Sequence, residues 1–168
     1  ILGDRNRMSY DAGISYIRNV FEATRTLQKN PDDLDARGII MMGASLSTSS
    51  RLGIGKEEPF AYEIYELEFL PEKLFGSSYR RSLTSVFPRF LQAMGKHHAD
   101  DIRKFYHDAF GFDSSIEESS RKLVELFEGF GVEMYYDGKI TREQVDAIPC
   151  HTELSKEEVF DIINSLIR

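Results

Sequence analysis

The sequence predicts an all-α fold, and three observations support this prediction. Apolar residues recur at helical spacing along nearly the whole 168-residue chain. Capping and turn-forming residues stand where these apolar segments begin and end. No stretch alternates convincingly with a period of two, and the only strand candidate, residues 132–136, is short. The chain has no internal repeat, low-complexity tract or long linker, so residues 1–168 are expected to form a single helical domain.

The expected helices are bounded by specific cap, turn and proline residues. Apolar faces predict helices at residues 9–28, 32–51, 57–69, 81–94, 100–110 and from 113 onward. Two more helices begin at Thr141-Arg142-Glu143-Gln144 and Ser155-Lys156-Glu157-Glu158, which match the capping-box pattern. Gly76-Ser77-Ser78 is expected to be a turn. We expect a helix break near Pro71, and a kink or a change of helix at Pro88.

The second expected helix has a distinctive start and a distinctive middle. Asn30 can cap it, Pro31 suits its first turn, and the acidic residues that follow favour the positive end of the helix dipole. Small residues around Gly43 let a neighbouring backbone come close. We therefore expect a central helix that is packed on several sides. Gly53 to Gly55 should end it.

Composition places the chain among ordinary globular proteins. Hydrophobic residues make up 41% and charged residues 29% of the sequence. The formal net charge of −7 argues against nucleic acid or an anionic membrane as a partner, because neither attracts a negative surface. No apolar run approaches the roughly 20 residues that a membrane-spanning helix needs.

The termini and the single cysteine bear on where the protein works. Cys150 has no partner for an internal disulfide, and the N-terminus lacks the basic and apolar pattern of a signal peptide. These features predict a cytoplasmic protein. The chain does not begin with Met, so we expect either a processed product or a fragment of a longer protein.

A glycine turn near residue 138 partly matches a calcium-binding loop. With Gly138 at the sixth position, the required oxygen ligands would come from Glu133, Tyr135, Asp137 and Gln144. A tyrosine at the third position and a glutamine at the twelfth leave this loop short of negative charge. We therefore expect a tight turn before a capped helix.

The histidines and the cysteine do not form a recognisable catalytic or metal-binding pattern. His97 and His98 are adjacent, so they point in different directions on a helix, and His107 has no partner at zinc-ligand spacing. We expect solvated or helix-capping roles for them. Cys150 and His151 are neighbours in a loop, where a nucleophilic dyad would rarely find its geometry. Cys150 is expected to act as a small buried apolar residue.

Two further patterns bear on ligand binding. Gly53-Ile54-Gly55-Lys56 lacks the preceding strand and the spacing of a nucleotide-binding loop, so no cofactor domain is expected within this chain. A group of acidic residues is expected to be a solvated helix face, with a cryptic acidic metal site as the alternative. Its members are Glu57, Glu58, Glu63, Glu66 and Glu68.

Several segments together resemble one enzyme family. The first are Asn30 to Arg37 (NPDDLDAR) and Met41 to Leu46 (MMGASL). In the same order follow Gly53 to Gly55, Leu74-Phe75-Gly76, Phe87-Pro88, Arg103-Lys104-Phe105 and Leu154-Ser155. In order and spacing these segments resemble the iron-containing (group III) alcohol dehydrogenases, particularly the butanol-dehydrogenase-like members. The resemblance covers about residues 9–168.

The resemblance implies a fold and a missing half. Members of that family join an N-terminal α/β domain that binds NAD(P) to a C-terminal helical domain, as dehydroquinate-synthase-like proteins do. An Asp and three His of the helical domain hold iron or zinc, which polarises the alcohol or carbonyl oxygen during hydride transfer. Residues 1–168 are expected to be the C-terminal part. The nucleotide-binding domain is absent from this chain, and no cofactor is expected within it.

The positions of the family's metal ligands are altered here. The Asp and the first His precede the matching part of the chain. Counting back from Phe87-Pro88 places the other two ligands at Tyr65 and Tyr79, and a further family histidine at Phe69. A neutral tyrosine, with a pKa near 10, is a poor ligand for iron or zinc. We therefore expect no catalytic, cofactor-binding or metal-binding residue in this chain, and a cleft filled by these three aromatic rings.

Three functional hypotheses follow. The first is a catalytically silent, dehydrogenase-like helical domain with a structural, binding or dimerisation role, whose partner is its own nucleotide-binding domain or a second copy. The second is the C-terminal half of an active NAD(P)-dependent alcohol or aldehyde oxidoreductase with an altered or absent metal, in which Tyr65 or Tyr79 donates a proton. The third is an unrelated all-α interaction module with a different helix order.

Overall fold

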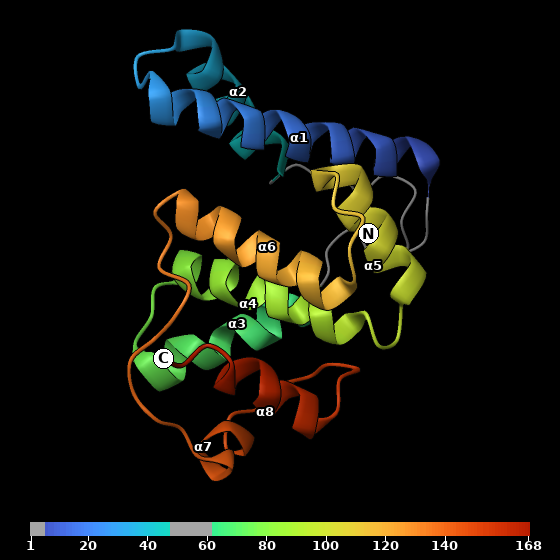
Figure 1. Ribbon diagram of the computed structural model, residues 1–168. Coiled ribbons are helices and arrows are strands. Elements are labelled where there is room, and N and C mark those ends of the chain that lie inside the picture. Colours follow the sequence, from blue (N-terminus) through green and yellow to red (C-terminus); the bar gives the residue numbers. More distant parts are fainter. Residues whose placement is uncertain (1–5, 48–61) are drawn as a thin grey trace. The chain divides into compact units, whose positions relative to one another are not determined.

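A computed structural model of the chain describes residues 6–47 and 62–168 (Figure 1). Within these ranges every regular element is a helix, which confirms the predicted all-α fold. The strand candidate at residues 132–136 contributes one isolated parallel bridge, between Tyr136 and Ile167. The helices are α1 (Arg7–Lys29), α2 (Leu34–Ser47), α3 (Tyr62–Phe75), α4 (Tyr79–Met94), α5 (Ala99–Phe110), α6 (Ile116–Gly129), α7 (Arg142–Asp146) and α8 (Lys156–Asn164).

The described residues form two compact units. Unit 1 contains residues 6–47 and 104–113, and unit 2 contains residues 62–103 and 114–168. Residues 99–103 of α5 belong to unit 2, and residues 104–110 of the same helix belong to unit 1. The single domain expected from the sequence stays a prediction. None of the helices in the described ranges is long and apolar enough to cross a membrane.

In unit 1, α1 and α2 are joined by a short turn whose capping differs from the prediction. Asn30 caps the C-terminus of α1, where its backbone N–H donates to the carbonyl of Thr26 at 2.8 Å. The N-terminus of α2 is instead capped by Asp33, whose carboxylate accepts from the backbone N–H of Ala36 at 2.8 Å. Pro31 lies in the turn before α2, not in its first helical turn. Asn30 was expected to cap α2, and this prediction was wrong because the chain turns before the second helix begins.

The helix α2 is not the central helix that its small residues suggested. Among the described residues it packs mainly on α1. A Cβ atom added to Gly43 would lie 2.9 Å from Val20 Cγ2 and 3.0 Å from Tyr16 Cε2, so the expected close approach occurs there, on one side. On the other sides Met41 and Met42 are 74% and 66% exposed. The glycines at 53–55, which were expected to end this helix, lie outside the described residues.

Two proline-containing helices form the framework of unit 2. The helix α3 continues through Pro71 to Phe75, and α4 continues through Pro88 to Met94. The predicted break near Pro71 and the predicted change of helix at Pro88 were therefore wrong. Each proline removes one backbone hydrogen bond, at a cost of about 3 kcal/mol. Both prolines are buried, and the packing of α3 against α4 offsets that cost.

The core of unit 2 surrounds α4, which contacts α3, α6 and α8. The apolar side chains of these helices are almost completely buried; they include Leu67, Leu70, Val86, Phe90, Leu91, Leu123 and Ile163. Burial of each such side chain contributes about 1.5–3 kcal/mol. After α3, Gly76 adopts a φ of +63°, which lets the chain turn at the predicted Gly76-Ser77-Ser78 segment and begin α4.

Both predicted capping boxes are present and hold α7 and α8. Thr141 and Gln144 exchange side-chain and backbone hydrogen bonds at the start of α7, and Ser155 and Glu158 do so at the start of α8. Hydrogen bonds from the backbone and side chain of Ser155, together with His97, lower the pKa of Glu158 to about 2. The last helix is therefore fixed by its N-terminus as well as by its apolar face.

Candidate functional site

The three aromatic positions singled out in the sequence share one region of unit 2 with two carboxyl groups. Tyr65 is followed on α3 by Glu68 and Phe69 after three and four residues, and Glu72 comes four and three residues after these two, so all four lie on one face of that helix. Tyr79 is the first residue of α4, and its hydroxyl interacts with Tyr65, Glu68 and Glu72. We call these five residues the aromatic–acidic cluster.

The rings of this cluster do not fill a packed cleft. Tyr65 is 37% exposed, and Phe69 and Tyr79 are each 49% exposed. We expected the three rings to replace a metal with packing, and this prediction was wrong. Their positions on α3 and at the beginning of α4 leave the outer parts of the rings open to solvent. They form an exposed aromatic surface beside the buried carboxyl group of Glu68.

Glu68 is the unexpected member of the cluster. It was predicted to lie on a solvated helix face, yet it is only 2% exposed, beside the fully buried Leu67. Burial, and then its interaction with Glu72, raise the pKa of Glu68 to about 7. Within the described chain its Oε2 atom has no donor when both carboxyls are ionised, whereas a proton on either carboxyl allows a hydrogen bond between them.

The other members of the predicted acidic face behave differently. Glu63 accepts a hydrogen bond from the Thr152 hydroxyl at 3.2 Å, and Glu66 accepts one from the backbone N–H of His151 at 3.2 Å. Both glutamates are half-buried and tie α3 to the loop before α8. The prediction of a solvated face therefore fails for these residues too. Glu57 and Glu58 lie outside the described residues.

Tyr79 is held in its neutral form. Burial raises its pKa above the ordinary value, and Tyr65, Glu68 and Glu72 raise it further. Each neighbouring negative or hydrogen-bonding oxygen makes the phenolate less favourable. A neutral phenol can donate a hydrogen bond or a proton, but it is not a metal ligand.

The cluster does not fit the iron or zinc site of the family that the sequence resembles. Such sites use imidazole nitrogen, thiolate or ionised carboxylate ligands. Here Phe69 has no donor atom, Tyr79 resists ionisation, and Glu68 shares its environment with Glu72. Nowhere in residues 6–47 and 62–168 do three or more His, Cys, Asp or Glu side chains gather in a way that could hold a metal ion.

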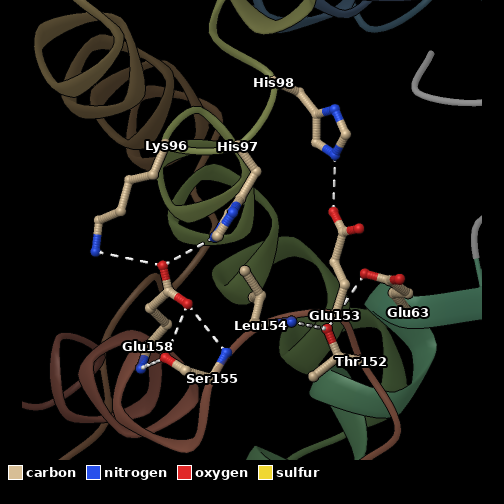
Figure 2. A network of polar contacts seen from close by, with 9 residues as sticks. All are labelled: Glu63, Lys96, His97, His98, Thr152, Glu153, Leu154, Ser155 and Glu158. Carbon is tan, nitrogen blue, oxygen red and sulfur yellow. Dashed lines mark hydrogen bonds and ion pairs between the residues drawn. The ribbon is translucent and has the colours of Figure 1, made fainter.

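The histidines serve as polar contacts between segments of the chain. Figure 2 shows His97 and His98, just after α4, reaching Glu158 and Glu153 at the start of α8 and in the loop before it. The nitrogen–oxygen distances are 3.1 Å and 2.8 Å. In unit 1, His107 contacts Asp113 at 2.6 Å. All three contacts are exposed, which agrees with the solvated role expected for these histidines, and their partners are carboxylates.

The cysteine–histidine pair and the glycine turn also have structural explanations. Burial, and then Glu66 and Glu63, raise the pKa of the Cys150 thiol to about 11, so the thiol is poorly suited to act as a nucleophile. Gly138 has a φ of +133°, which fits a tight turn before α7. The Gly53-Ile54-Gly55-Lys56 segment lies outside the described residues.

Comparisons with known proteins show a likeness of fold to a solved structure. No protein-family model matches the chain, and no curated protein matches it significantly. Among solved structures, the crystal structure of NADH-dependent butanol dehydrogenase A from Thermotoga maritima matches with a TM-score of 0.81 and 18% sequence identity. The match covers 99% of this chain and 48% of that protein. The chain has the fold of the matched half of that dehydrogenase.

This likeness confirms the fold that the sequence resemblance implied. It also argues against the third hypothesis, which required a different helix order. The chain spans about half the length of the dehydrogenase it matches, and at 18% identity the likeness concerns the fold. What the chain does must therefore be argued from its own residues.

Proposed function

We propose that this chain is an alcohol-dehydrogenase-like helical domain without metal chemistry of its own, and that its role is structural or binding. The main support for this proposal is the aromatic–acidic cluster, whose side chains are poor ligands for a divalent metal. The candidate partners are a nucleotide-binding domain and a second copy of the chain. A cytoplasmic location is part of the same proposal.

Metal content and activity test this proposal directly. Residues 1–168 are purified without chelators or affinity metals, and iron and zinc are measured by mass spectrometry. The same preparation is assayed for NAD(P)-dependent oxidation of primary alcohols. We expect less than a tenth of an equivalent of either metal, by rough estimate, and no turnover. Stoichiometric metal together with alcohol oxidation would refute the proposal.

A second function is favoured by one specific observation, the neutral Tyr79 beside Glu68 and Glu72. In an enzyme that also contains a nucleotide-binding domain, Tyr79 would donate a proton to the carbonyl oxygen of an aldehyde as hydride arrives from NAD(P)H. Glu68 would hold a proton near neutral pH. No metal takes part in this scheme.

Nucleotide binding separates the two functions. The full-length protein is titrated with NADH and with NADPH in a calorimeter and is then assayed with aldehydes. Under the second function the protein binds one of the two, and Tyr79→Phe lowers kcat by about 10²–10⁴ while nucleotide affinity stays the same. If neither nucleotide binds to the full-length protein, the second function is wrong and the silent domain stands.

A further inference from the structure

A cavity in unit 1 carries a net positive charge among the described residues that line it. Its volume is about 590 Å³, and α1 and α5 provide its walls. Arg18, Arg25 and Lys29 line it from α1, and Glu22 is the one acidic residue in the part of its lining that the structure describes. Three cations against one acid leave a local charge of +2 in a chain whose net charge is −7. This local reversal of sign is unusual enough to need a physical reason.

Within residues 6–47 and 62–168, the three cations are also without an ion-pair partner. Many exposed Arg and Lys side chains in the described ranges have a carboxylate within 4.0 Å, as Arg37 has with Asp32. By contrast, the side chains of Arg18, Arg25 and Lys29 make no ion pair or hydrogen bond with any part of the chain that the structure describes. A guanidinium without a protein partner keeps its donors available for an anion.

The spacing of these cations allows a single small ligand to reach more than one of them. With a rise of 1.5 Å per residue, Arg18 and Arg25 lie about 10 Å apart along α1, and Arg25 and Lys29 about 6 Å apart. All three fall on one face of the helix, because they are separated by seven and four residues. Arg18 and Arg25 precede the last turn, so an anion between them avoids the negative end of the helix dipole.

The wall between the cations is aromatic. Phe21 of α1 meets Phe110 of α5 edge to face, with 5.1 Å between the ring centroids, and both line the cavity. Flat apolar groups pack well on such a surface. The cavity volume falls within the usual range for small-molecule sites, about 300–1,000 Å³. The surroundings therefore suit a ligand that joins an anionic group to a flat apolar body.

We propose that the Arg18–Arg25–Lys29 cavity binds a small organic phosphate that carries a flat apolar group. A phosphate monoester carries a charge of about −1.5 to −2 at neutral pH, which matches the local charge of the cavity better than a single carboxylate does. Its oxygens face the guanidinium groups of Arg18 and Arg25, and its apolar part lies on Phe21 and Phe110. The site belongs to unit 1 and includes no residue of the aromatic–acidic cluster, so it is independent of the proposed function.

Phenyl phosphate, inorganic phosphate and benzyl alcohol separate the contributions of charge and ring. Each is titrated into the ¹⁵N-labelled chain while backbone amide shifts are followed by NMR. We expect phenyl phosphate to shift amides of α1 and the end of α5, and to bind at least roughly tenfold more tightly than either of the other two. Equal affinity for phenyl and inorganic phosphate, or the absence of binding, would overturn the proposal.

Charge-matched variants locate the site. The triple variant Arg18→Gln, Arg25→Gln, Lys29→Gln should weaken phenyl phosphate binding by about tenfold or more. The control variant Lys73→Gln, Arg80→Gln, Lys156→Gln loses the same charge at exposed residues that also lack ion-pair partners in the described structure, and it should bind as the unaltered chain does. Equal weakening in both variants would show a general charge effect and refute the site.

A substitute variant and a competing ligand complete the test of this site. If circular dichroism shows that the triple variant does not fold, the single variant Arg25→Gln replaces it. This variant keeps the other two cations and should weaken phenyl phosphate binding several-fold. Hexaglutamate is titrated as a competitor. If it binds at this cavity more tightly than phenyl phosphate, the surface is a docking site for an acidic protein segment and the small-ligand proposal is wrong.

Discussion

Glu68 shows at the scale of one residue how burial changes chemistry. Its pKa is raised from 4.5 to about 7, mainly by burial and then by Glu72. A raised pKa in the folded state means that ionisation opposes folding. The stability of the chain should therefore fall as pH rises from about 4.5 to about 7, and then stay level. The loss is at most about 3.5 kcal/mol if the whole pKa difference is expressed.

Glu68→Gln tests this linkage. Relative to the unaltered chain, the variant should gain free energy of unfolding on going from pH 5 to pH 8, by about 1–3 kcal/mol. Urea unfolding at the two pH values measures the difference. Glu117→Gln, which removes an exposed carboxyl of α6, should show a difference close to zero. A flat difference for Glu68→Gln would mean that Glu68 ionises normally in the folded chain.

Cys150 supplies a second prediction, one of reactivity. Its pKa of about 11 leaves roughly one thiolate in a thousand at pH 8. Alkylation by iodoacetamide should therefore be slow at pH 8 and should accelerate about tenfold per pH unit up to pH 10. Mass spectrometry of timed samples gives the rates, with free cysteine as the reference. A rate that reaches a plateau below pH 9 would disprove the raised pKa.

The sequence predicted the aromatic members of the cluster but missed the acidic ones. Tyr65, Phe69 and Tyr79 could be found because their spacing matches that of the histidines in the enzyme family that the sequence resembles. Glu68 looked like one of several surface glutamates, although it is followed after two residues by the buried Leu70. Its position between two buried leucines of α3 was a signal that could have been used. What the sequence could not provide was the position of Glu72 and Tyr79 over it, which depends on how α3 meets α4.

At the scale of helices, the sequence predicted helix boundaries correctly where capping residues set them and wrongly where tertiary packing sets them. The capping boxes at Thr141 and Ser155 were predicted correctly because all their atoms lie within one turn. Pro71 and Pro88 were taken as breaks, yet both helices continue. A single missing hydrogen bond is a small local cost, and the burial that offsets it comes from segments distant in the sequence.

Glycine substitutions give opposite expectations in two elements. A Cβ atom at Gly95, after α4, would lie 2.8 Å from both Cγ2 and Cδ1 of Ile116, so Gly95→Ala should destabilise the chain by about 1–3 kcal/mol. Gly38 lies in α2, and apart from its own helix backbone and chain neighbours no atom of the described residues lies within 4 Å of such a Cβ, so Gly38→Ala should stabilise by about 0.5–1 kcal/mol. Thermal unfolding of the two variants measures both signs. Destabilisation by Gly38→Ala, or its absence in Gly95→Ala, would contradict this account.

For the whole molecule, the resemblance of the sequence and the likeness of the fold agree, and only the function proposed for the chain departs from both. The dehydrogenase fold is present at 18% identity because caps, turns and apolar faces suffice to specify a helical arrangement. Function depends on a few side chains that the fold does not constrain. If Tyr65, Phe69 and Tyr79 are what prevents metal binding, introducing histidines at these positions should create a metal site.

The variant Tyr65→His, Phe69→His, Tyr79→His tests this at the scale of the whole chain. Residues 65 and 69 are four apart on α3, the spacing at which two histidines share a metal, and residue 79 adds a third ligand from α4. When the free zinc concentration is a hundred times the Kd, binding to the folded state alone would stabilise the chain by about 2.7 kcal/mol. We therefore expect zinc to raise the Tm of this variant by several degrees. Zinc should not change the Tm of the unaltered chain or of the control double variant Tyr65→Phe, Tyr79→Phe. An equal rise in the unaltered chain would place a metal site among the residues present and would refute the metal-free function proposed for it.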